Sequence, residues 1–179
     1  MDRDVDEPVE IAAYDVRWPA WFEEDARELR QALGSNLHSL EHFGSTAVPQ
    51  LHAKPIIDIL VAPARWPLEV ADRNALEKLG YHYLGEAGVP GREYFRRRAP
   101  HATNLSVVQR SSRLWHDNIA LRDYLIAHPE AARLYGEAKR ASWNSGATML
   151  IEYSRSKSDF VAKLVAAAQS WRTRCGAPV

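Results

Sequence analysis

The stretch over residues 44–58 combines residue types that bind phosphate with a residue type that binds a divalent metal ion. It opens with a glycine, a serine and a threonine, and it ends with Asp58 inside an apolar run that predicts a buried strand. Backbone N–H groups and hydroxyls in such a turn are common donors to phosphate oxygens. A carboxylate within a buried strand is costly unless something binds it. We therefore predict a nucleotide site, with Asp58 as catalytic and metal-binding carboxylate. The predicted phosphate-binding residues of this stretch are Gly44, Ser45, Thr46 and Lys54.

Glu41 and His42 directly precede this stretch on a predicted strand over residues 37–43. Successive side chains of a strand point to opposite faces, so at most one of the two can face a given pocket. We assign Glu41 as a second catalytic carboxylate and His42 as a pocket residue. Each assignment has a structural alternative. His42 could be a satisfied sheet histidine, Gly44-Ser45-Thr46 could be an ordinary helix cap, and Asp58 could be a structural carboxylate paired to Lys54 or to an arginine.

The remaining candidates lie further along the chain. Arginine binds phosphate bidentately, so we assign Arg92 and Arg96 to phosphate binding, although a basic run at 96–98 also suits a solvated edge strand. On a strand, Arg96 would share one face with Arg98, while Arg97 would point to the other. Lys157 is a further phosphate-binding candidate, and on a helix it shares a face with Tyr153, four positions before it. The additional pocket candidates are His101, Asn104 and Tyr153.

The elements that would position these residues follow from apolar periodicity and from glycine and proline positions. Strands are expected at 9–11, 37–43, 54–62, 81–84, 93–98 and 103–109, and helices at 19–33, 68–79, 114–128, 129–143 and 151–172. The fold class is therefore α+β, with a mixed sheet in the N-terminal half that is packed by helices, and a helical C-terminal part. We expect a disordered lead-in over 1–8, a single domain over 9–172 and a flexible tail over 173–179.

Composition narrows the classes of protein. The 179 residues carry 23 basic and 23 acidic side chains, so the formal net charge of zero disfavours nucleic-acid binding by bulk electrostatics. One cysteine, Cys175, allows no intrachain disulfide, and the acidic N-terminus is not a signal peptide. No apolar stretch approaches the length of a membrane span. We expect a cytoplasmic protein with a nucleotide or another phosphorylated small molecule as partner, and the sequence leaves the oligomeric state open.

A longer set of landmarks resembles the signature of the GrpB-like family, which is grouped with the polymerase-β-like nucleotidyltransferase fold. The landmarks are the run EHFGSTAVP at 41–49, the run AKPIIDI at 53–59, Tyr14-Asp15, Trp18-Pro19, Gly91-Arg92, Arg122-Asp123-Tyr124-Leu125, His128-Pro129, Tyr153 and Lys157. The resemblance implies that Gly44 and Ser45 form a phosphate turn and that Asp58 is the first of two carboxylates that hold Mg²⁺.

The chain departs from that family pattern at three places. The second carboxylate would fall at Leu60, which cannot coordinate a cation. The family often carries a His-Leu-His run where this chain has Asn-Leu-Ser at residues 104–106. A glycine that is usual in the family after Val48-Pro49 is replaced by Gln50. Three hypotheses therefore stay open. The first is a nucleotidyltransferase that uses a nucleoside triphosphate and Mg²⁺ and transfers the nucleotidyl group to a hydroxyl of a small molecule or a protein. Its lysine and arginine side chains would neutralise the charge on the leaving pyrophosphate. The second is a nucleotide-binding or regulatory module without catalysis, and the third is a protein-interaction domain.

Overall fold

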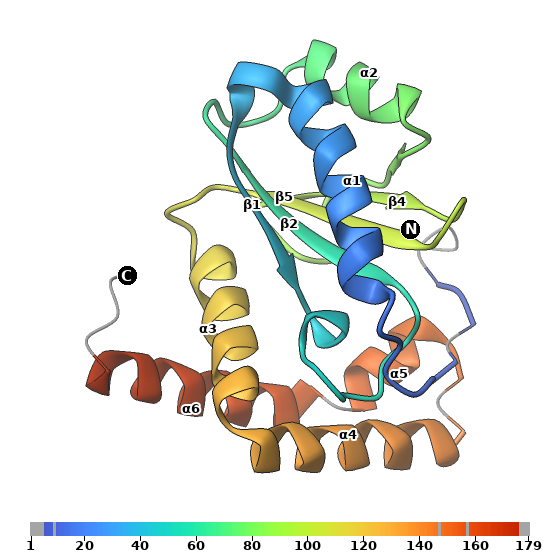
Figure 1. The fold of residues 1–179 in the computed structure, drawn as a ribbon, viewed down its shortest axis with the longest axis vertical. Coiled ribbons are helices and arrows are strands. Elements are labelled where there is room, and N and C mark those ends of the chain that lie inside the picture. The colour runs from blue at the N-terminus through green and yellow to red at the C-terminus, as the bar shows by residue number, and fades with distance from the viewer. Residues whose placement is uncertain (1–5, 9, 147, 157, 176–179) are drawn as a thin grey trace.

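A five-stranded mixed sheet forms the centre of the fold (Figure 1). The computed structural model describes residues 6–8, 10–146, 148–156 and 158–175, except for the side chains of Tyr153 and Ser156. The strands are β1 (Leu37–Phe43), β2 (Ile57–Pro63), β3 (His82–Tyr83), β4 (Arg92–Arg97) and β5 (Thr103–Val108). They lie in the order β1-β2-β5-β4-β3, and β2 and β5 run parallel while the other neighbours are antiparallel. The α+β class with a mixed sheet is confirmed.

The helices begin and end at residues whose local chemistry favours helix termini. They are α1 (Trp18–Leu33), α2 (Val70–Lys78), α3 (Arg113–Ala127), α4 (Pro129–Asn144), α5 (Leu150–Ser156) and α6 (Ser158–Arg174), with short 3₁₀ turns η1 (Gly34–Asn36) and η2 (Ser45–Ala47). α1 has a proline in its first turn and ends at Gly34, whose φ is 50°. The Ser112 hydroxyl caps α3 by accepting a hydrogen bond from the Trp115 amide at 3.3 Å.

Helices α1 and α2 cover one face of the sheet, and α1 crosses the front of it in Figure 1. The apolar side chains of Leu29 in α1 and Leu76 in α2 are fully buried, and they belong to the same hydrophobic core as Ile57 and Ile59 of β2. Burial of one such side chain stabilises the fold by about 1.5–3 kcal/mol. Because side chains alternate along β2, this core places Asp58 and Leu60 on the opposite face.

The α1 face also contains a buried polar network that joins the helix to the sheet. Asp25 of α1 is 1% exposed, and it accepts hydrogen bonds from Arg97, from the His101 Nε2 at 2.9 Å and from the Thr103 hydroxyl at 2.6 Å. His101 also stacks on Trp21, with ring centroids 5.2 Å apart. Arg97 of the basic run and the pocket candidate His101 therefore stabilise the packing of α1 on the sheet, away from Asp58.

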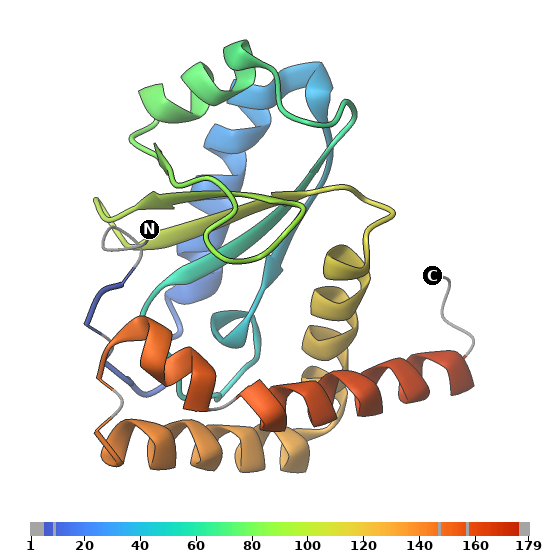
Figure 2. The same ribbon diagram turned by 180° about the vertical axis from the view of Figure 1, so that it is seen from behind.

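The opposite face of the sheet is covered only in part (Figure 2). α3 packs over one end of it, where Leu60 belongs to the same hydrophobic cluster as Trp115 and Ile119. Beneath the sheet, α3, α4 and α6 pack around Leu125 and Tyr135. None of the helices within the described ranges combines the length and apolar character needed to cross a membrane.

Several element boundaries differ from the predictions. β2 begins at Ile57 and not at Lys54, because the segment with Pro55 bends, and the Ile56 amide donates to the Lys54 carbonyl at 2.8 Å. The single helix expected over 151–172 is two helices, α5 and α6, and α6 continues to Arg174, beyond the boundary expected for the tail. The strand expected over 9–11 is not formed by residues 10 and 11, and Val9 lies outside the described residues.

Residues 6–8, which we expected to belong to a disordered lead-in, lie against the start of α5. Pro8 forms an isolated bridge with Met149, and the Leu150 amide donates to the Glu7 carbonyl at 2.9 Å. Backbone hydrogen bonds and ion pairs hold this segment, and neither is visible as apolar periodicity. Residues 1–5 and 176–179 lie outside the described residues.

Candidate functional site

The turn between β1 and β2 is built around Gly44. β1 ends at Phe43, which pairs with Asp58 across the sheet, and Gly44 follows with φ 71° and ψ −167°. This region of backbone conformation is essentially restricted to glycine. A Cβ atom at Gly44 would lie 2.7 Å from Asp58 Oδ2, closer than real Cβ contacts come. Glycine therefore allows the chain to cross directly over the Asp58 carboxylate.

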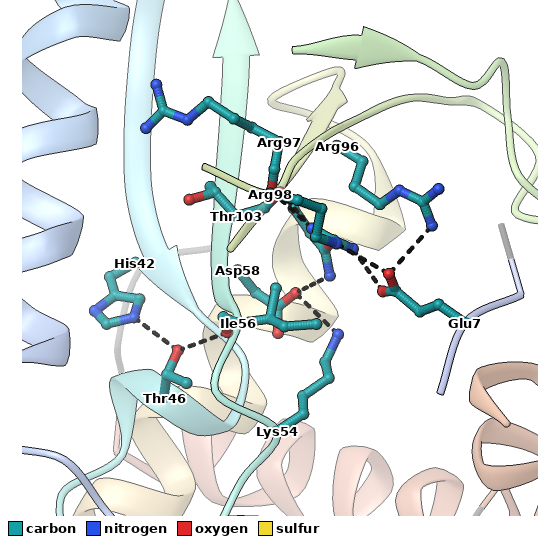
Figure 3. A network of polar contacts seen from close by, with 11 residues as sticks. Glu7, His42, Thr46, Lys54, Ile56, Asp58, Arg96, Arg97, Arg98 and Thr103 are labelled. Atoms are coloured by element: carbon teal, nitrogen blue, oxygen red, sulfur yellow. Dashed lines mark hydrogen bonds and ion pairs between the residues drawn. The ribbon is translucent and has the colours of Figure 1, made fainter. Parts of the chain in front are cut away.

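Asp58 is bound on one oxygen by a cation and an amide (Figure 3). Its Oδ1 accepts a hydrogen bond from Asn104 Nδ2 at 2.8 Å, and Lys54 Nζ lies 3.5 Å from the same oxygen. The Asp58 side chain is only 17% exposed, so these partners offset much of the cost of burying its charge. Asn104 connects the carboxylate to the basic run, because its Oδ1 accepts from the Arg98 guanidinium at 3.1 Å.

A cavity of about 190 Å³ opens beside this carboxylate, and we call it the Gly44 cavity. It is bounded by the turn after β1, the segment before β2, and helices α4 and α5. Its lining residues are Gly44, Ser45, Lys54, Asp58, Tyr135, Lys139, Leu150 and Ser154. The structure thus brings three of the predicted phosphate-binding residues, Gly44, Ser45 and Lys54, together with Asp58.

Two lining residues of α4, Tyr135 and Lys139, were missed by the sequence analysis. Lys139 is 1% exposed, and its ammonium group donates to the His52 carbonyl and lies 4.7 Å from the centroid of the Tyr135 ring. Burial raises the pKa of Tyr135 to about 12, although a hydrogen bond with Ser45 acts in the opposite direction. The available signal was helical spacing: the buried positions of α4 recur at i, i+3, i+4 and i+7, and the last of them is Lys139.

Glu41 and His42 point to opposite faces of the sheet, and neither lines the Gly44 cavity. Glu41 lies on the Asp58 face, where its carboxylate accepts a hydrogen bond from the Arg122 guanidinium at 2.7 Å. His42 stacks on Phe22 of α1 at a centroid distance of 4.7 Å, and burial lowers its pKa to about 4. Its Nε2 lies 3.0 Å from the hydroxyl of Thr46, which is itself buried. His42 and Thr46 therefore brace the turn from the α1 side.

Arg92 holds a loop, and it does not line the Gly44 cavity. Its guanidinium donates to the carbonyl oxygens of Glu86 at 3.1 Å and Ala87 at 3.0 Å, and it lies 4.4 Å from the ring centroid of Tyr94. Backbone acceptors and the aromatic face thus occupy the group that we assigned to phosphate. Burial raises the pKa of Tyr94 to about 12, so its phenol is neutral near pH 7.

Arg96 and Arg98 lie on the same side of the sheet as Asp58. Arg96 pairs with Asn104 in the β4–β5 register, and Arg98 follows directly after β4. Both guanidinium groups contact the Glu7 carboxylate. They do not line the Gly44 cavity, but the Asn104 amide connects Arg98 to Asp58.

Two candidates cannot be placed. Lys157 lies outside the described residues, and so does the side chain of Tyr153, whose backbone belongs to α5. Their assignment stays a prediction.

The donor groups around Asp58 do not fit a two-ion centre. The position two residues further on the same face is Leu60, and Glu41, which pairs with it across β1 and β2, is held by Arg122. Lys54 and an amide already occupy one oxygen of Asp58. Among the described residues, no three His, Cys, Asp or Glu side chains are grouped so that they could hold a metal ion.

Two larger hollows lie elsewhere on the molecule. One of about 490 Å³ runs between residues 48–52 and helices α3 and α4, and one of about 700 Å³ lies at the end of the sheet near His38 and His116. We place the site in the smaller Gly44 cavity, because it combines the glycine turn, the lysines and the carboxylate.

Comparisons with known proteins agree with this architecture. UPF0157 protein PA4798 of Pseudomonas aeruginosa is 34% identical over 170 residues, which cover 91% of this chain and 69% of that protein. The crystal structure of conserved protein GrpB from Enterococcus faecalis matches with a TM-score of 0.78 at 32% identity, over 90% of this chain and 99% of that chain. Terminal uridylyl transferase 4 from Trypanosoma brucei matches with a TM-score of 0.47 at 15% identity, over 80% of this chain and 44% of that chain, a likeness too low to carry a functional argument.

The curated relatives differ in length. This chain spans 92% of one of them but only 48% of another. The model of the GrpB protein family matches residues 8–167, and the chain therefore belongs to the GrpB family.

Proposed function

We propose that the Gly44 cavity binds the phosphate end of a nucleotide or of another phosphorylated small molecule. The observation that carries this proposal is the lining of the cavity. It combines two lysines, Lys54 and Lys139, and a glycine–serine turn with one carboxylate, Asp58. Lys54 and Asn104 already bind that carboxylate, and the lining holds two ammonium groups against one carboxylate. Such a surface attracts a compact anion.

The size of the cavity supports a phosphate group more than a whole nucleotide. Pockets that enclose drug-sized ligands measure about 300–1,000 Å³. The Gly44 cavity measures about 190 Å³, so a base and a sugar would extend beyond it.

Binding without transfer is the form of this function that the geometry supports best. Two-metal nucleotidyl transfer needs carboxylates that hold both ions, and the strand offers Asp58 followed by Leu60. A Mg²⁺-dependent nucleotidyltransferase is the second candidate, because the Gly44–Ser45 turn and Asp58 on the following strand are what the family resemblance implied for one.

Thermal unfolding with inorganic pyrophosphate and with each of the four ribonucleoside triphosphates tests the proposal. Ligand at about one hundred times its dissociation constant adds about 2.7 kcal/mol, which corresponds to a rise in Tm of roughly 5–10 °C. Lys54→Gln should reduce the rise, whereas Lys78→Gln, at an exposed position of α2 across the sheet, should preserve it.

Each ligand is measured with and without Mg²⁺. A rise in Tm without the metal supports phosphate binding by the lysines and the turn. A rise that requires Mg²⁺ and is lost in Asp58→Asn would favour the nucleotidyltransferase candidate. No rise with any of these anions would refute the proposal.

A further inference from the structure

The segment over residues 6–8 is fastened to the start of α5 by its backbone and by one side chain. The Leu150 amide donates to the Glu7 carbonyl at 2.9 Å, and the Ile151 amide donates to Asp6 Oδ1 at 3.0 Å. Leu150 also lines the Gly44 cavity. The segment is therefore held at the edge of the candidate site.

This fastening places the Glu7 carboxylate on two arginines (Figure 3). Arg98 donates to it through Nε at 2.9 Å and through a terminal nitrogen at 2.5 Å, and Arg96 donates to it at 3.4 Å. Both oxygens of the carboxylate are engaged in a fork geometry. A guanidinium binds phosphate oxygens in the same bidentate way.

The side chain of Asn104 connects the arginine pair to the Gly44 cavity. Arg98 donates to the Asn104 amide oxygen at 3.1 Å, and the nitrogen of that amide donates to Asp58 at 2.8 Å. Arg96, Asn104 and Asp58 are neighbours across three adjacent strands. A ligand with several phosphate groups that enters the cavity would therefore meet these guanidinium groups next.

We propose that Arg96 and Arg98 form a second anion subsite and that the Glu7 carboxylate occupies it until a phosphorylated ligand displaces it. This proposal rests on the proposed function, because the ligand is the one that enters the Gly44 cavity. Glu7 competes as an internal anion, so the apparent affinity for the ligand is lowered by the fraction of molecules in which it is seated. Releasing it leaves both guanidinium groups without this carboxylate and raises the positive charge beside the cavity.

Calorimetric titration with inorganic tripolyphosphate, a linear anion with three phosphate groups, tests the competition. Glu7→Gln should lower the Kd about fivefold or more, the lower range of typical coupling between two binding events. Glu10→Gln, which removes an exposed acid three residues further along, should change the Kd by less than about twofold. In an Arg98→Gln background, Glu7→Gln should give no gain, because the two residues act through one contact.

The outcomes separate this proposal from the proposed function. An unchanged Kd in Glu7→Gln, an equal gain in Glu10→Gln, or a gain that persists without Arg98 overturns the subsite, even when Lys54→Gln still weakens binding. If neither the natural chain nor folded Glu7→Gln binds tripolyphosphate, the proposed function fails together with the subsite. The Tm of each variant shows that it is folded.

Discussion

Replacing Gly44 by alanine tests whether the turn was shaped around the Asp58 carboxylate. The added methyl group would lie 2.7 Å from Asp58 Oδ2 and 3.1 Å from its Cβ. It cannot be accommodated by rotating the backbone, because φ 71° and ψ −167° are disfavoured for alanine. Asp58 would have to shift, and its hydrogen bond from Asn104 would weaken.

Two contributions set the magnitude of the destabilisation. Holding a side chain in this backbone region costs about 1–3 kcal/mol. Loss of the hydrogen bond between Asn104 and Asp58 adds about 1 kcal/mol. We expect Gly44→Ala to lower the free energy of unfolding by about 2–4 kcal/mol, which is a fall in Tm of roughly 5–15 °C for a chain of this length.

Urea unfolding of matched variants separates the two contributions. Gly88 also has a positive φ, 76°, but a Cβ there would have nothing within 4 Å. Gly88→Ala should therefore show only a backbone cost of about 1–2 kcal/mol. In an Asp58→Ala background, the cost of Gly44→Ala should fall towards this value. A cost for Gly44→Ala no larger than that of Gly88→Ala would refute the reasoning.

Three further predictions follow from single contacts. Asp58→Asn should tighten pyrophosphate binding about tenfold by calorimetry, because it frees Lys54 and removes a charge that repels the anion; weaker binding would contradict this. Gln50→Gly should raise the Tm by about 1–4 °C, since an exposed glutamine at φ 63° is strained by more than the entropy that glycine loses; an unchanged Tm would argue against that strain. Burial lowers the pKa of His42 to about 4 in the folded chain, so on acidification the unfolded chain takes up this proton at a higher pH than the folded chain. The free energy of unfolding should therefore fall as the pH drops from 6.5 to 4, by at most about 1.4 kcal/mol per pH unit. Above pH 6.5 the stabilisation from neutral His42 is fully present. His42→Gln should reduce this slope in urea unfolding measured across that pH range.

Local patterns were sufficient for much of the fold because they report local physics. Apolar alternation and turn residues predicted the four longer strands and most helices to within a few residues. The order of the strands in the sheet depends on long-range pairing, which periodicity does not encode. The separation of α5 from α6 was missed because both carry apolar residues at helical spacing.

The candidate site was predicted where its residues are close in sequence. Gly44, Ser45, Lys54 and Asp58 lie within fifteen positions, and the structure brings them around one cavity. Side chains whose partners come from distant elements were assigned less well. Glu41 is held by Arg122 of α3, and neighbouring positions along the chain carry no sign of this contact.

Glu7, near the N-terminus, is another residue whose distant partners could not be predicted from the sequence. In the sequence it belongs to a polar lead-in, whose composition predicts solvation. In the structure it bridges Arg96 and Arg98, which are about ninety positions away. An interaction of this kind is determined by where the sheet ends and where α5 begins, so it follows from the assembled fold.

The surroundings of Leu60 explain why the second metal-binding carboxylate is not simply a missing residue in an otherwise intact two-ion site. Its side chain is 1% exposed and packs with Trp115 and Ile119 beneath α3. A carboxylate at this position would lie among apolar groups, and an unpaired buried charge of this kind is strongly destabilising. The apolar packing of α3 on this end of the sheet therefore suits a leucine at position 60. On the same face, the neighbouring row keeps Asp58, Asn104 and Arg96 side by side. Apolar packing at one end of the face and cations at the other favour a protein that holds an anion over one that holds two metal ions.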